Sequence, residues 1–298
     1  KGGDIILSTG SRDVGKGGGV YMSAGEATAS GSAGGDVEII AGYGSSVSMG
    51  QGGNVILSGG KANGGTGGVV SVMSGEGKAS TSGSVSIRTQ NAGNSGVSGA
   101  LIFRSGTSSS GASGEIVIES GAATGGKAGD MHFSVGTGAN SVGGDILMDG
   151  GNSVLDTGGQ ISLKSGIGVT SSSGFIHIAT PNAGTAGVSG SVLFSSGTTS
   201  SGASGSLRFN TGIATGGKAG DILLSVGDGD QGFGGDIYVK AGETTASNSN
   251  GGTVKIFGGT GSSTSGGVGG SIHVQGGLGY GNTGGALSLT SGASSSTS

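Results

Sequence analysis

GGDIILSTG, residues 2–10, is the first of nineteen copies of one pattern that fills the chain. Each copy has two small residues, a variable residue and a short stretch with apolar residues at fixed places. The ninth position is glycine in seventeen copies. The copies begin at residues 2, 17, 34, 52, 67, 82, 98, 113, 128, 143, 158, 173, 189, 204, 219, 234, 251, 269 and 284. A fixed period of 15 to 18 residues is typical of solenoid proteins.

Positions are counted here from the first small residue of each copy. Positions 4 and 6 carry a large apolar residue in every copy, from Ile5 and Leu7 to Leu287 and Leu289. Positions two apart share one face of an extended strand, so this spacing predicts strands with one apolar face. We therefore expect positions 4 and 6 to point inward. This regularity also argues against a disordered Gly/Ser-rich tract, which the 78 glycines alone would suggest.

The connectors between these stretches have six to nine residues, whereas antiparallel hairpins prefer two to five. This length favours one coil per copy, with equivalent strands stacked in parallel. The fold prediction is an all-β parallel solenoid (β-helix or β-roll) of about nineteen rungs, with residues 1–298 as one continuous domain. An up-and-down antiparallel sheet is the alternative.

Composition excludes several classes of protein. Glycine does not recur at every third residue and there is one proline, so the chain is not collagen. Cysteine is absent, which excludes disulfides and thiol chemistry. The net charge is −4 with scattered basic residues, so we expect no nucleic-acid partner. No apolar run is long enough for a membrane helix, and no signal peptide is visible.

Candidate chemical sites are few. Gly-Gly-Asp triplets such as the one ending at Asp4 resemble calcium-binding repeats, but those need a nine-residue period. His132, His177 and His273 lie in copies at least three apart, too far for one zinc ion. No paired carboxylates or nucleophile with a base stand out. The sequence therefore predicts no catalytic residue, no metal site, no cofactor and no enzyme activity.

Position 5 points away from positions 4 and 6 and is the surface that we expect to bind. Apolar residues in a row on a flat face form a contiguous patch, which is typical of an interaction site. The candidate self-association face consists of Ile6, Tyr21, Ile56, Ile102, Val117, Leu147, Leu193, Leu223 and Tyr238. A partly solvated face without a partner is the alternative.

Two longer repeats overlie the short one. Residues 82–130 recur at 173–221, an offset of 91, and the opening copies recur at an offset of 217. Lys1 corresponds to residues that lie inside a connector in other copies. We expect the sequence to be a segment of a longer repeat array or a processed unit that stacks end to end.

The phrase Gly-Gly-Asp-Ile-x-Leu-x-x-Gly with Ser/Gly connectors resembles Gly/Ser-rich repeat proteins at the surfaces of diatoms and related algae. This resemblance spans the full chain and implies a secreted structural or adhesive role. The predicted function is an extracellular or cell-surface structural protein that forms rods or fibres with itself as partner, and no membrane. The alternative is a module that adsorbs to ice, mineral or polysaccharide, although the regular threonine rows of insect antifreeze solenoids are missing.

Overall fold

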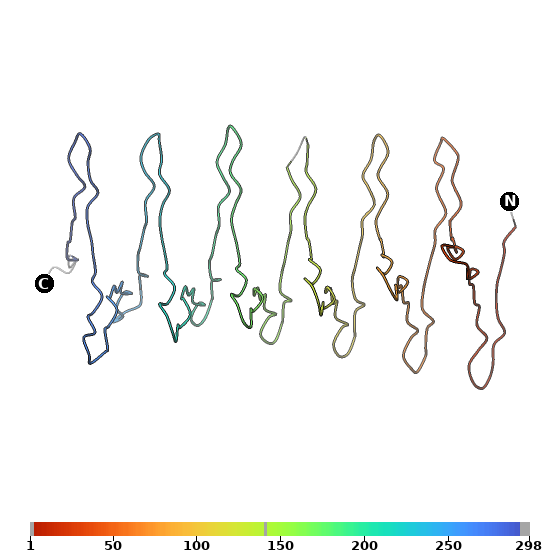
Figure 1. Cartoon of the computed structure of the whole chain (residues 1–298). Coiled ribbons are helices and arrows are strands. Elements are labelled where there is room, and N and C mark those ends of the chain that lie inside the picture. Colours follow the sequence, from red (N-terminus) through yellow and green to blue (C-terminus); the bar gives the residue numbers. More distant parts are fainter. Residues whose placement is uncertain (1–2, 140–141, 293–298) are drawn as a thin grey trace. The chain divides into compact units, whose positions relative to one another are not determined.

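The computed structural model describes residues 3–139 and 142–292 and contains neither a helix nor a strand in those ranges (Figure 1). The β-solenoid prediction is therefore wrong. A solenoid needs backbone hydrogen bonds between every pair of neighbouring rungs, and such ladders are not formed here. The expectation for the start at Lys1 lies outside the described residues.

The chain instead turns back on itself at its connectors (Figure 1). At nine connectors the N–H at position 2 of one copy donates to the C=O at position 9 of the copy before, over 2.8–3.0 Å. The nine bonds join Gly35 to Gly25, Gly53 to Gly42, Gly68 to Gly60, Gly83 to Gly75, Gly159 to Gly151, Gly174 to Gly166, Gly252 to Gly242, Gly270 to Gly259 and Gly285 to Gly277. We call the place where the two ends of a connector meet a junction, which is closed where this hydrogen bond forms and open where it does not. Positions 3–8 of a copy are called an arm.

Closed junctions set the direction of neighbouring arms. A bond between the two ends of a connector makes the chain leave beside the place where it entered, so consecutive arms run in opposite directions. Stacked solenoid rungs would all run the same way. The arms lack the ladder of an antiparallel sheet, because no backbone hydrogen bond links positions 3–8 of neighbouring copies among the described residues.

Position 2 is glycine in all nineteen copies, and the junction gives a steric reason for it at some of them. A Cβ atom on this glycine would lie 2.9 Å from the Thr9 Cβ at Gly18 and 2.9 Å from the Gly60 backbone nitrogen at Gly68. Real Cβ contacts do not reach such distances, so glycine is needed for the close approach there. At six other junctions the Cβ would meet position 8 at an ordinary 3.5–3.7 Å, and at Gly3 it would meet nothing within 4 Å.

The size of the position-8 side chain decides whether a junction closes. All seven junctions with glycine or alanine there form the closing bond, and the six with threonine or valine do not among the described residues. The six are Thr9, Thr89, Val135, Thr180, Thr211 and Val226. At two of these junctions the hydroxyls of Thr9 and Thr180 instead donate to the position-2 carbonyls of Gly18 and Gly190.

Serine at position 8 gives both outcomes. The junctions after Ser74 and Ser165 close, whereas those after Ser105, Ser120 and Ser196 lack the bond within the described ranges. Both closed cases have glycine at position 11, Gly77 and Gly168, where a side chain would collide with connector carbonyls. Where position 8 is serine, the junction therefore closes only if the connector is tight.

Short hydroxyl bonds shape the connectors, and they recur with the longer repeats. Ser108 Oγ donates to Ser110 O over 3.0 Å, and its equivalent Thr199 Oγ1, 91 residues on, donates to Ser201 O over 2.9 Å. Such local side-chain bonds stabilise turns, which explains why connectors are rich in serine and threonine.

Among residues 3–139 and 142–292, two residues other than glycine adopt positive φ, and both fall in connectors that recur at an offset of 217. Asn248 (φ 58°) is equivalent to Gly31 (φ 78°), and Met49 (φ 60°) is equivalent to Gly266 (φ 96°). Asparagine tolerates this region, but methionine is strained there. The connector that ends at Gly53 therefore stores strain at Met49.

We expect Met49→Gly to stabilise this connector by about 1 kcal/mol, because glycine removes the cost of the left-handed conformation. Exchange of the Gly53 amide hydrogen, which closes the junction to Gly42, should slow by about fivefold. Ser48→Gly is the control, because Ser48 is next to Met49 but does not itself have a positive φ. Equal slowing in both variants would show that the strain at Met49 is unimportant.

Positions 4 and 6 are not buried, which corrects the expected apolar interior. No buried hydrophobic residue is present in the described part of the chain, and position 4 is 46–57% exposed from the second copy onward. Ile5, which has no copy before it, is 93% exposed, and Leu289, which has none after it, is 88% exposed. Position 4 is therefore about half covered, and position 6 is covered less, at 53–77% exposed in the second to eighteenth copies.

The structure divides into two units, Lys1–Leu147 and Met148–Ser298, and each contains closed and open junctions of the kinds described above. The boundary falls inside the arm of the copy that begins at residue 143. The described ranges hold no helix of the length and apolarity needed to cross a membrane.

Candidate self-association face

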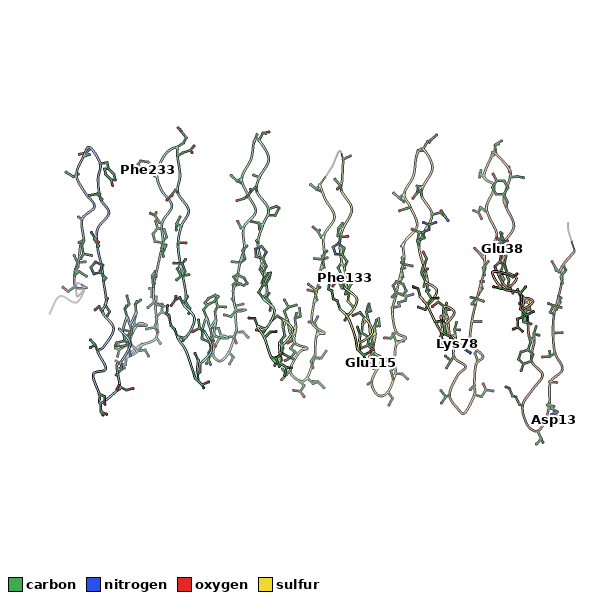
Figure 2. The ribbon with its side chains drawn as sticks, viewed as in Figure 1. Asp13, Glu38, Lys78, Glu115, Phe133 and Phe233 are labelled. Carbon is green, nitrogen blue, oxygen red and sulfur yellow. The ribbon has the colours of Figure 1, made fainter. Side chains whose placement is uncertain are left out.

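Every residue of the candidate face is exposed, and each is 62–88% accessible to solvent. From the second copy onward, each of these residues is more exposed than position 4 of its own copy, whereas in the first copy Ile5 is the more exposed. Figure 2 shows side chains standing off the ribbon along each arm, including the position-6 residue Phe133.

The candidate face falls into short groups along the chain. Apolar residues occupy position 5 of two consecutive copies at Ile6 and Tyr21, at Ile102 and Val117 and at Leu223 and Tyr238. The remaining three, Ile56, Leu147 and Leu193, have polar residues at position 5 of both neighbouring copies. The expectation of a contiguous apolar row therefore reduces to three pairs and three single residues.

One apolar hollow lies beside the pair Ile102 and Val117. It has a volume of about 380 Å³ and is lined by Phe103, Ile116, Val117 and Ile118. Positions 4, 5 and 6 of one arm thus meet position 6 of the arm before. Sequence reasoning missed this hollow, although the signal was a phenylalanine at position 6 followed by a copy with three consecutive apolar residues.

The equivalent place 91 residues later holds an aromatic pair. Phe194 and Phe209 correspond to Phe103 and Ile118, and their rings lie 6.5 Å apart at an angle of 83°. Edge-to-face aromatic pairs of this geometry are favourable.

Charged residues form local pairs only. Lys127 Nζ lies 2.7 Å from Asp130 Oδ2, and its equivalent Lys218 lies 2.8 Å from Asp221. All four side chains are exposed, so each pair contributes at most about 1 kcal/mol. These pairs fix the last turn before an arm and do not form a site.

No group of three histidine, aspartate or glutamate residues that could share a metal ion exists among the residues of known placement. His132, His177 and His273 lie on position 5 of separate arms. The described residues offer exposed apolar side chains and backbone groups that mostly lack backbone partners.

Comparison of the chain with protein-family models, with curated proteins and with solved structures finds no match in any of the three.

Proposed function

We propose that this protein is a structural protein of the cell exterior that assembles with further copies of itself into rods or fibres. The observation that carries this proposal is the exposure of apolar residues at positions 4 and 6 in every described copy and at position 5 in nine copies. The extracellular location rests on the resemblance to Gly/Ser-rich repeat proteins of algal surfaces.

The exposed area supports association. A folded protein of 27.5 kDa exposes roughly 11,000 Å² and its unfolded chain roughly 40,000 Å². This chain exposes 29,535 Å². A stable protein interface buries about 1,600 Å² in total. The accessible area that this chain has beyond that of a folded protein is far larger than such an interface needs.

A second copy of the chain is the partner that fits best. Apolar groups recur at intervals of 15 to 18 residues, and a partner that covers them needs apolar groups at the same intervals. The chain itself has that spacing. Its low net charge of −4 and its few charged residues also keep the repulsion between copies small.

The test is sedimentation velocity of the full chain over a range of concentrations. We expect the wild type to form large species. The variant Ile102→Asp/Leu193→Asp places two carboxylates on the candidate face, and burying an unpaired carboxylate costs several kcal/mol. Assembly should then need about a hundredfold higher concentration.

The control is Ser109→Asp/Ser200→Asp, which adds the same charge in connectors at equivalent places of the long repeat. It should assemble like the wild type. A wild type that stays monomeric at every concentration would contradict the proposal, and so would equal effects of both variants.

A further inference from the structure

The backbone of the arms has almost no hydrogen-bond partners. The described residues form eleven backbone–backbone hydrogen bonds, nine at junctions and two inside connectors. Folded proteins form about one hydrogen bond per residue, and about two-thirds of these join backbone groups. The N–H and C=O groups of positions 3–8 are therefore available to another partner along every arm.

The side chains of the arms suit pairing between strands. From the second copy onward, position 4 is half-covered and each apolar position-5 residue is more exposed than position 4 of the same copy, as expected for extended chain with a period of two. Pro181, the chain's one proline, lies outside the arms at position 9, and charged residues are 10% of the chain. Proline and charge are the devices with which natural proteins prevent strand edges from pairing.

We propose that the arms pair edge to edge, backbone to backbone, with arms of a second copy, so that strands form on assembly. This inference rests on the proposed function and specifies how the copies join. Unpaired N–H and C=O groups beside regular apolar side chains form a template for another chain of the same spacing. The second copy supplies that spacing and, through its position-2 glycines, the same close approach at the junctions.

The test removes backbone donors without changing the apolar positions. Four arms carry serine at the exposed position 5, namely Ser71, Ser86, Ser162 and Ser288. Their N–H groups form no hydrogen bond within the described chain, so proline there costs the free protein no bond. The test variant has proline at all four positions, and the matched control has alanine at all four.

Assembly of the full chain is followed by sedimentation, and strand content by the amide I infrared band of the same samples. Wild type and alanine control should gain strand signal as the concentration rises. The proline variant should need at least a tenfold higher concentration for the same gain. Mixing ¹³C-carbonyl-labelled with unlabelled wild type should shift the band, because labelled and unlabelled strands then alternate.

Three results would overturn the inference. One is assembly of the wild type without a gain of strand signal, which would leave the proposed function intact. Another is equal behaviour of the proline and alanine variants. The third is strand signal that is already complete in dilute monomer, since the arms would then pair within one chain. A wild type that never assembles would contradict the proposed function itself.

Discussion

We expect Gly68→Ala to open the junction between the fourth and fifth copies, whereas Gly60→Ala leaves it closed. The two glycines are the donor and the acceptor of one hydrogen bond of 2.8 Å. A Cβ on Gly68 would lie 2.9 Å from the Gly60 nitrogen, but a Cβ on Gly60 meets nothing within 4 Å. The obstacle at Gly68 is backbone, which cannot rotate away.

The expected cost of Gly68→Ala is about 2 kcal/mol, from steric strain together with the loss of the bond. Exchange of the amide hydrogen of residue 68, corrected for its intrinsic rate, should be more than tenfold faster in Gly68→Ala than in Gly60→Ala. If the two variants exchange alike, the close approach at position 2 does not explain its glycine.

Replacing the six branched residues at position 8 with alanine should close six more junctions. The variant changes Thr9, Thr89, Val135, Thr180, Thr211 and Val226. Alanine leaves room for the position-2 N–H to reach the position-9 carbonyl, as it does after Ala24, Ala41 and Ala241. Each new bond contributes about 1 kcal/mol, so the six position-2 amides should exchange about fivefold more slowly.

The reverse change tests the same rule. Ala24→Val and Ala41→Val should open their junctions and expose the amides of Gly35 and Gly53 to exchange. Slow exchange that persists in these valine variants, or six alanine substitutions that protect no further amide, would show that side-chain size at position 8 does not control closure.

The positions that matter could be recognised in the sequence, but the reasons for some could not. Positions 4 and 6 were identified as apolar, but the expected burial of these positions is wrong, since no hydrophobic residue is buried in the described ranges. Glycine at position 2 is visible in all nineteen copies, yet its role depends on position 8 of the copy before, six to nine connector residues away. Spacing along one copy contains no information on that contact.

The self-association of the candidate face stays a prediction. Its members are exposed, but which residues lie next to them depends on the contact between arms. The hollow beside Phe103 depends on the same contact, since its lining comes from two consecutive copies. The residue pattern predicts which side chains share one face of an arm. Which residues lie next to that face depends on the contact between arms.

By itself the sequence determined the period, the apolar positions, the longer repeats at offsets of 91 and 217 and the absence of cysteine chemistry. The tertiary structure decided the direction of neighbouring arms. Alternation with a period of two is the same whether the next arm runs parallel or antiparallel, so it cannot distinguish a stacked coil from a chain that turns back. The bond between position 2 and position 9 across a connector makes that choice, and it forms where the position-8 side chain is small enough or the connector tight enough to allow it.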